Sequence, residues 1–291
     1  MTLTARALRE RCAREMDNAR GFAGCTWLHR AFLAVPREHF VPDRVWWPAR
    51  GEDGLYNLYD RTQKPRAWLK AVYMPGVPLI TQIDDGAVPP TGPATGAFTS
   101  SISSPGVVIE LVRHLAPEPG ERILEVGTGT GYTTALLTHR AGDHGNVVTI
   151  EIDAGLARRA RHRLHALGMS PRVVTGDGEQ GHPACAPYDR ILATASVRSI
   201  PPAWLRQLRP GGILLAPLDS PFGHDLLVRL EADGHGCARG HFVAAVEFMR
   251  ARGQRAQRPY AELGWPAEAD PGPWERMCVV AGPSGQRIRS R

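Results

Sequence analysis

The sequence lacks a long apolar run and has few cysteines. No stretch approaches the roughly 20 consecutive apolar residues that a membrane helix needs. The first 21 residues alternate charged and apolar positions, without the apolar core of a secretory signal. The five cysteines are scattered and include no C-x-x-C pair, and the eleven histidines show no metal-ligand spacing. We therefore expect a cytoplasmic protein with no disulfide framework, no membrane segment and no bound metal.

Lysine is almost absent, since Lys64 and Lys70 are the only two lysines among 35 basic residues. Arginine therefore supplies nearly all the positive charge of a chain whose formal net charge is +6. The arginines are spread along the chain and form no cluster typical of a nucleic-acid-binding surface. They are compatible with an arginine-biased composition, or with an acidic peptide as the partner. The sequence does not indicate an oligomeric state.

Three segments differ in pattern. Residues 1–95 are expected to form an N-terminal extension of helices and loops on the substrate side, with a helix over Thr26–Val35 that stops at Pro36. Residues 96–250 alternate strand and helix patterns. Residues 251–291 are rich in Arg, Pro and Gly, a composition compatible with a partly disordered C-terminal extension.

Within the N-terminal extension, the stretch Trp46–Pro93 is rich in Pro, Gly, Trp and Tyr. It predicts no regular structure beyond short strands near Ala71–Tyr73 and Leu79–Gln82. Long irregular segments in compact chains often serve as binding loops.

The middle segment predicts an α/β fold with a doubly wound, mostly parallel sheet, because strands and helices alternate there. Two further apolar runs predict antiparallel edge strands. Such sheets bind ligands at the carboxyl ends of their parallel strands. The expected strands are Arg122–Val126, Asn146–Glu151, Arg172–Thr175, Tyr188–Thr194, Gly212–Leu218, Leu226–Leu230 and Phe242–Met249.

A glycine-rich turn, G-x-G-x-G at residues 127–131, follows the first of these strands. Glycines allow a tight turn and close approach of a ligand to the backbone, and the following helix start offers free N–H groups to an anion. Tyr132 stands where a dinucleotide fingerprint would have Gly or Ala, and no G-K-[ST] is present. Taken alone, the turn could be purely structural.

Two acidic residues make a ligand site more convincing. Glu151 ends the next strand, where a carboxylate can accept hydrogen bonds from two ribose hydroxyls. Asp177 lies between glycines at the end of the third strand, where it can accept a hydrogen bond from the exocyclic amine of adenine. Together, the turn and the acids predict an adenosyl-type ligand at three consecutive strand ends.

In these motifs the chain resembles the protein-L-isoaspartate O-methyltransferase family. The resemblance runs from about residue 30 to 218, and the SISSP element is more specific than the glycine turn because most methyltransferases lack it. The matching motifs are AFLAVPREHFVP (31–42), SISSP (101–105), ILEVGTGTGY (123–132), VTIEID (148–153), GDG (176–178), APYDRI (186–191) and WLRQLRPGGILLAP (204–217).

The resemblance implies a Rossmann-like methyltransferase fold and S-adenosyl-L-methionine as the cofactor, with S-adenosyl-L-homocysteine as its product. It implies Ser103 as the catalytic residue beside the substrate carboxylate, with Ser104 and Tyr73 also in the substrate site. Ser103 and Ser104 could instead cap the helix that begins at Pro105. The implied cofactor residues are Ser101, Ile102, Gly127, Thr128, Gly129, Gly131, Tyr132, Glu151, Ile152, Asp177, Gly178 and Thr194.

The chain departs from a minimal member of this family in its longer N- and C-terminal parts. Residues 65–86 resemble relatives associated with ribosomal peptide maturation, which methylate an aspartate of a modified, acidic precursor peptide; the ester then closes to an aspartimide. General isoaspartate repair is the alternative. A small-molecule or RNA methyltransferase is less favoured, because Ala195-Ser196-Val197 lacks the Pro-Pro-aromatic pattern of adenine methylation.

Overall fold

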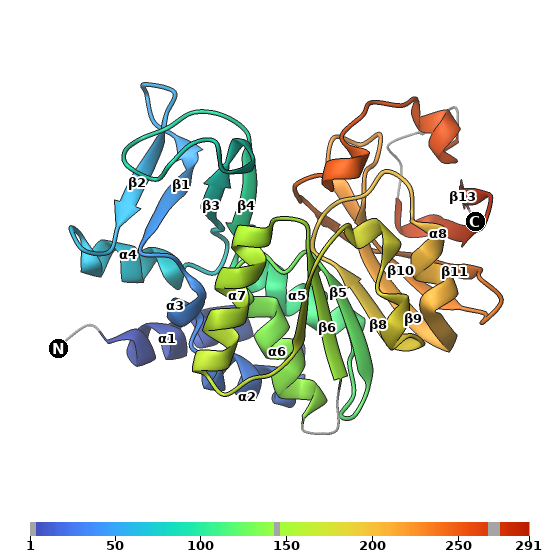
Figure 1. Ribbon diagram of the computed structural model, residues 1–291, viewed down its shortest axis with the longest axis horizontal. Coiled ribbons are helices and arrows are strands. Elements are labelled where there is room, and N and C mark those ends of the chain that lie inside the picture. Colours follow the sequence, from blue (N-terminus) through green and yellow to red (C-terminus); the bar gives the residue numbers. More distant parts are fainter. Residues whose placement is uncertain (1–3, 143–145, 267–273, 291) are drawn as a thin grey trace. The chain divides into compact units, whose positions relative to one another are not determined.

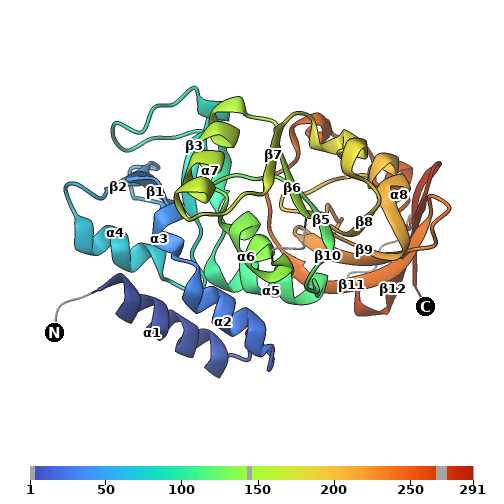
Figure 2. The same ribbon diagram turned by 60° about the horizontal axis from the view of Figure 1, so that its bottom comes forward.

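The computed structural model describes residues 4–142, 146–266 and 274–290 (Figures 1 and 2). The chain forms two compact units, each built from several segments. The first unit comprises Met1–Arg113, Gly129–Arg140 and Arg158–Met169, and the second comprises His114–Thr128, Ala141–Ala157 and Ser170–Arg291. Among the described residues, no helix is long and apolar enough to cross a membrane.

The first unit contains a four-stranded antiparallel sheet in the order β2-β1-β3-β4. Its strands are β1 (Arg44–Arg50), β2 (Tyr56–Asp60), β3 (Leu79–Ile83) and β4 (Phe98–Ile102). Trp46, Tyr56 and Ile80 contribute to its own small apolar core. The predicted strand at Leu79–Gln82 is confirmed. The expectation that most of Trp46–Pro93 is irregular is wrong, because aromatic and β-branched side chains pair across strands that are distant in sequence.

Helices complete the first unit. The predicted helix at Thr26–Val35 is confirmed, but the predicted strand at Ala71–Tyr73 is wrong. Pro65 opens a helix in its first turn, and the buried residues Trp68, Ala71 and Val72 recur at helical spacing. The helices are α1 (Ala5–Asn18), α2 (Thr26–Ala34), α3 (Arg37–Phe40), α4 (Pro65–Val72), η1 (Asp84–Gly86), α5 (Pro105–Leu115), α6 (Tyr132–Ala141) and α7 (Ala154–Ala166), the last three extending beyond this unit at one end.

The second unit contains a nine-stranded sheet in the order β13-β12-β11-β10-β9-β8-β5-β6-β7. Strands β5 to β9 are parallel and β10 to β13 pair antiparallel, which confirms the predicted α/β class with its antiparallel edge. The strands are β5 (Arg122–Val126), β6 (Asn146–Glu151), β7 (Arg172–Thr175), β8 (Tyr188–Ala193), β9 (Leu208–Leu218), β10 (Asp225–Ala232), β11 (Ala238–Val246), β12 (Met277–Gly282) and β13 (Gly285–Ser290).

The C-terminal residues extend this sheet. Strands β12 and β13 lie within the predicted extension 251–291, and they pack Val279 and Ile288 into the same core as Trp204 on α8 (Pro202–Gln207). Residues 267–273 and 291, part of the segment with possible disorder, lie outside the described residues. The segment boundaries at residues 95 and 250 stay a prediction. The unit's 3-10 helices are η2 (Gly178–Gln180), η3 (Pro183–Cys185), η4 (Arg252–Gln254), η5 (Tyr260–Leu263) and η6 (Trp274–Arg276).

Candidate active site

The predicted ligand residues of the second unit meet at one edge of its sheet. Val126 of β5 pairs with Ile150 of β6 and with Ala193 of β8. Glu151 of β6 pairs in turn with Thr175 of β7. Because these strands are parallel and in register, the residues that follow them come together at their carboxyl ends. This edge carries Gly127, Thr128, Glu151, Ile152, Asp177, Gly178 and Thr194.

Gly127 adopts a backbone conformation that admits no side chain. Its φ is +98°, and an added Cβ would lie 2.5 Å from Oγ1 of Thr194. The Thr194 hydroxyl donates to the carbonyl of Gly127 at 2.6 Å, and it lies 3.2 Å from the carbonyl of Val126. Thr194 therefore holds the turn against the sheet, a role that the sequence did not indicate.

A buried polar chain lies beneath the same turn. Oγ1 of Thr128 is 2.7 Å from Oγ1 of Thr149, whose hydroxyl donates to Oε2 of Glu125 at 2.7 Å. All three side chains are buried, so their hydrogen bonds are needed to offset desolvation. Glu125 was not among the predicted site residues. Its place inside the apolar run ILEV could have indicated a buried carboxylate that needs hydrogen-bond partners.

The two acids are oriented by the backbone that follows them. Glu151, 7% exposed, accepts a hydrogen bond from the Asp153 N–H at 3.0 Å. Asp177 accepts one from the Glu179 N–H at 3.0 Å. Each carboxylate is thus positioned by an N–H two residues later, as in an Asx-type turn. Ile152, 43% exposed, lies beside the first acid.

Gly178 is confined as closely as Gly127. A Cβ there would lie 2.4 Å from Cγ1 of Val126, and the Gly178 carbonyl accepts a hydrogen bond from Nε1 of Trp204 at 2.8 Å. The glycine therefore lets the backbone beside Asp177 pack directly on the end of β5.

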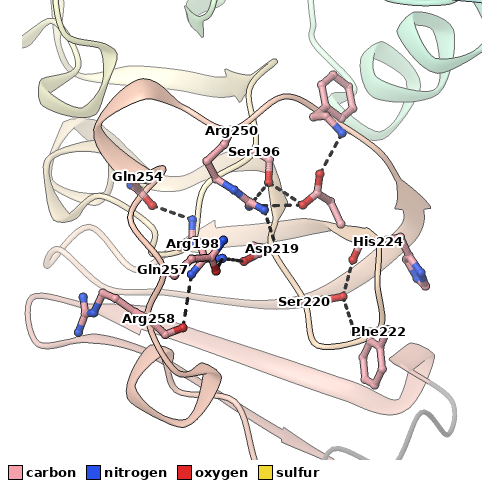
Figure 3. A network of polar contacts seen from close by, with 12 residues as sticks. Ser196, Arg198, Asp219, Ser220, Phe222, His224, Arg250, Gln254, Gln257 and Arg258 are labelled. Atoms are coloured by element: carbon pink, nitrogen blue, oxygen red, sulfur yellow. Dashed lines mark hydrogen bonds and ion pairs between the residues drawn. The ribbon is translucent and has the colours of Figure 1, made fainter. Parts of the chain in front are cut away.

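A C-terminal segment crosses this edge and was not predicted. Gln254 donates to Glu179 at 2.9 Å, and its Oε1 accepts from the Ser199 N–H at 2.9 Å. The same Oε1 accepts from the Arg198 N–H at 2.7 Å, the contact drawn in Figure 3. Arg252 lies 3.5 Å from Asp153 in an ion pair. The segment thus contacts residues just beyond the ends of β6, β7 and β8.

An ion-pair network anchors this segment to the sheet. Figure 3 shows Arg198 and Arg250 directed toward Asp219, with N–O distances of 3.1 and 2.6 Å. Asp225 accepts a hydrogen bond from the Ser196 hydroxyl at 2.7 Å, and burial raises the pKa of this carboxyl. Charges that are removed from water stabilise the fold only when they are well paired. Arg250, which follows β11, must therefore stay close to Asp219, and this holds the segment after β11 against the sheet. A single sequence offers no signal that these distant charges meet.

The first unit holds the SISSP residues. The Ser104 hydroxyl accepts from the Val107 N–H at 3.4 Å, a long contact in the position of a cap for α5. Among the residues that the structure describes, nothing forms a hydrogen bond with the Ser103 hydroxyl. Ile102 is buried in β4, where Ser101 pairs with Ile80. Within the described residues, the hydroxyls of Ser101 and Ser103 thus both lack a hydrogen-bond partner, whereas that of Ser104 has one.

The glycine turn reaches this unit at Gly129. Its φ is +53°, and a Cβ there would lie 3.7 Å from the carbonyl oxygen of Ser101. Gly131 has a φ of +93° and faces Ala160 and Leu164 of α7. Within this unit the structure therefore places predicted cofactor residues of the turn beside the SISSP strand.

A buried cation supports the Ser103 backbone. Arg37 is 0% exposed, and its guanidinium donates to the carbonyls of Val72 and Ser103 at 2.9 and 2.7 Å. It lies 5.0 Å from the ring centroid of Tyr132, which is also buried. Burial lowers the pKa of Arg37. The sequence analysis missed this residue, since nothing in REHF distinguishes a buried arginine from an exposed one.

Tyr73 is enclosed within the same unit. It is 1% exposed; its hydroxyl donates to Glu38 and accepts from Nε of Arg9 at 3.1 Å. Burial raises the pKa of Tyr73. These contacts give Tyr73 a structural role, and its contact with a substrate stays a prediction.

The parallel strands, the glycine turn and the acids at consecutive strand ends define an α/β methyltransferase fold. A solved structure from Plasmodium falciparum, described as a putative protein-L-isoaspartate O-methyltransferase in complex with S-adenosyl-L-homocysteine, shares this fold. It covers 86% of this chain and 99% of its own, with a TM-score of 0.61 and 15% sequence identity.

The family follows from sequence comparison. The family model "Protein-L-isoaspartate(D-aspartate) O-methyltransferase" matches residues 92–256. The enzyme of that name from Methylorubrum extorquens is 35% identical over 219 residues, 75% of this chain and 77% of the relative. The chain belongs to the protein-L-isoaspartate O-methyltransferase family. A namesake from Ignicoccus hospitalis is 42% identical over 131 residues, 45% of this chain, and the match spans 62% of that relative's length.

Proposed function

We propose that this chain is an S-adenosyl-L-methionine-dependent carboxyl O-methyltransferase that acts on isoaspartyl residues of proteins or peptides. The observation that carries the proposal is the edge at which Gly127, Glu151 and Asp177 follow parallel strands in register. Membership of the family supports the choice of an isoaspartyl carboxylate as the methyl acceptor.

The residues of this edge fit an adenosyl cofactor. The side-chain-free backbone at Gly127 leaves room for close approach, and the positioned carboxylates of Glu151 and Asp177 can accept from ribose hydroxyls and from the adenine amine. We propose the remaining predicted residues as neighbours of the same ligand: Ser101, Ile102, Thr128, Gly129, Gly131, Tyr132, Ile152, Gly178 and Thr194. Of these, the Thr194 hydroxyl would act through the turn, because backbone carbonyls already occupy it.

The reaction needs no general base from the protein. Bound S-adenosyl-L-methionine supplies an electrophilic methyl group on a sulfonium. A carboxyl with an unperturbed pKa near roughly 4 is ionised at neutral pH, so its oxygen can attack without losing a proton. The chain's task is to hold that carboxylate in line and to limit water. The Ser103 hydroxyl would orient the carboxylate, and Arg37 would keep the Ser103 backbone in place.

Two substrate classes follow from the sequence. The relatives named above favour isoaspartate repair over the ribosomal-peptide interpretation. Methylation of a peptide aspartate followed by aspartimide closure remains a second candidate, supported only by the resemblance over residues 65–86. In both cases the partner is a polypeptide, and we propose no nucleic acid substrate.

The five cysteines bear on where the reaction would occur. They are odd in number and scattered, with no C-x-x-C pair, a pattern typical of proteins in a reducing compartment. We propose a cytoplasmic location on this composition.

Methyl transfer from labelled cofactor to two matched peptides tests the substrate. One peptide carries isoaspartate, and the other carries aspartate in a constrained ring. Faster labelling of the isoaspartyl peptide is the expected result. Faster labelling of the constrained aspartate, followed by loss of methanol mass, would instead favour aspartimide formation. Cofactor binding without labelling of either peptide would contradict the proposed reaction.

We expect Ser103→Ala to lower kcat by about 10- to 100-fold, because a hydrogen bond to a charged group contributes roughly 1.5–3 kcal/mol. Cofactor affinity should stay nearly unchanged. Ser104→Ala is the comparison variant: it should lower the free energy of unfolding by up to about 1 kcal/mol through loss of a helix cap, and a fall in kcat as well would support the predicted place of Ser104 in the substrate site. Isothermal titration with cofactor, thermal unfolding and initial rates separate the two roles. An equal loss of cofactor binding in Ser103→Ala would show that its role is structural.

A further inference from the structure

Strands β10 to β13 present a face rich in arginine to solvent. Cross-strand pairing places Arg229, His241, Cys278 and Arg289 in one row. The same pairing places Glu231, Arg239, Val280 and Arg287 in the next row. Directly paired residues point to the same side of a sheet, so both rows lie on one face. The opposite face of these strands carries the apolar core.

The neutral residues of this face lie between cationic ones. Val280 of β12 is 54% exposed, and it is paired with Arg239 on β11 and with Arg287 on β13. Cys278, one row away, is paired with His241 and Arg289. Val280 and Cys278 of β12 thus lie between Arg239 of β11 and the arginines Arg287 and Arg289 of β13. A hollow of about 680 Å³ lies over β10, β11 and β12 and is lined by Arg229, Arg239, His241, Cys278 and Val280, among others.

Of the four arginines placed on this face, Arg229 is bonded to another element of the unit. Arg229 donates to the carbonyl of His114 at 3.1 Å. Within the described part of the chain, Arg239, Arg287 and Arg289 form no side-chain hydrogen bond or ion pair. Arg239 faces Glu231 across the β10–β11 pair, whereas Arg287 and Arg289 of β13 face neutral residues of β12. The β13 side of the face therefore carries positive charge that attracts an anion.

We propose that this face binds an acidic, extended segment of the polypeptide substrate, an inference that rests on the proposed function. Alternate side chains of an extended chain repeat at roughly 6.6–6.8 Å, the repeat of the residues within each strand of the sheet. Carboxylates at alternate positions of a segment lying along β12 would therefore meet Arg239 or His241 on one side and Arg287 or Arg289 on the other. Glu231 and Asp233 border the hollow on the β10 side, so the acidic segment would lie on the β12–β13 side, away from these two carboxylates.

Charge reversal of the face tests this assignment. The probe is a fluorescent 12-residue peptide that has Asp at alternate positions and contains no isoaspartate. Its uncharged control peptide has Asn in place of each Asp. The test variant is Arg239→Glu/Arg287→Glu. The control, Arg122→Glu/Arg172→Glu, makes the same charge change at exposed arginines on β5 and β7, which β8 and β9 separate from the face in the strand order. Binding is followed by fluorescence anisotropy at two salt concentrations.

We expect the test variant to weaken binding of the acidic peptide by about tenfold or more, because two attractions become repulsions. The control should bind within about twofold of the unaltered protein, and added salt should weaken binding. Equal losses in the two variants, equal binding of the uncharged twin, or no binding of the acidic peptide would overturn the proposal. The proposal would also be overturned if the test variant lost affinity for a single-stranded oligonucleotide but kept its affinity for the acidic peptide.

Methylation separates this inference from the proposed function. A short, uncharged isoaspartyl peptide should be methylated equally by the test variant, the control and the unaltered protein. The same peptide with an acidic tail should gain a lower KM only where the arginine face is intact. Failure to methylate either peptide would count against the proposed function, whereas anisotropy still reports on the face.

Discussion

Gly127→Ala is expected to weaken S-adenosyl-L-methionine binding by about two orders of magnitude. A non-glycine residue in the left-handed region costs roughly 1–2 kcal/mol, and the new methyl group would lie 2.5 Å from Oγ1 of Thr194. To relieve the clash, Thr194 must give up its bonds to the turn, at a further cost of roughly 1–3 kcal/mol for the carbonyls left behind. Relief of these costs moves the turn out of its present conformation, and restoring that conformation on binding lowers affinity about tenfold for each 1.4 kcal/mol. Isothermal titration measures the loss.

Gly211→Ala is the matched control for this prediction. Gly211 has a φ of +73°, but nothing lies within 4 Å of an added Cβ. Gly211→Ala therefore introduces similar backbone strain without a steric clash like that with Thr194. Its affinity for the cofactor should equal that of the unaltered protein. Gly127→Ala/Thr194→Ala removes the clashing oxygen and should recover part of the lost stability. Unchanged cofactor binding in Gly127→Ala would contradict the assignment of the turn to the cofactor.

Arg37→Met is expected to lower the free energy of unfolding by about 3 kcal/mol and kcat by more than tenfold. The change leaves two carbonyls in a buried region without their donor, and each costs roughly 1–3 kcal/mol. It also frees the backbone of Ser103, whose carbonyl lies 2.7 Å from the guanidinium. Arg37→Lys should behave similarly, because a single ammonium lacks the guanidinium fork that reaches Val72 and Ser103 together.

Chemical denaturation and single-turnover kinetics test this second prediction. The control is Arg14→Met, since Arg14 is exposed on α1; it should change neither quantity. Cofactor affinity should fall much less than kcat in Arg37→Met, because Arg37 contacts the SISSP backbone rather than the acids. A variant with normal turnover once folded would show that Arg37 serves stability alone.

Local sequence patterns correctly predicted the strands whose ends carry Gly127, Glu151 and Asp177. Strands β5 and β6 have the predicted bounds, and parallel pairing then brings Gly127, Glu151 and Asp177 together without further information. In this region a few consecutive residues are enough to predict each strand, because a buried parallel strand appears in the sequence as a short apolar run. Helix α2 was predictable for the same reason.

The rest depended on contacts between residues distant in sequence. The pairing of Trp46 with Ile80 creates a sheet that neither segment indicates alone. The burial of Arg37 depends on carbonyls 35 and 66 residues away. The Asp219 network likewise joins residues whose charges look like ordinary surface charges in the sequence. Local periodicity carries no information on such partners.

The outermost strand has a further consequence for the behaviour of the chain. An open strand edge can recruit other chains and aggregate, yet the Ile288 N–H of β13 donates to the Gly264 carbonyl at 2.8 Å. A Cβ at Gly264 would lie 2.0 Å from the carbonyl oxygen of Gln286, so the loop lies directly against the strand. Shortening the chain after β11 would keep the residues Gly127, Glu151 and Asp177 but would remove the strand that pairs with Ala238–His241 of β11. We expect such a shortened chain to associate with itself more readily, because those backbone groups would be unpaired at the edge of the sheet.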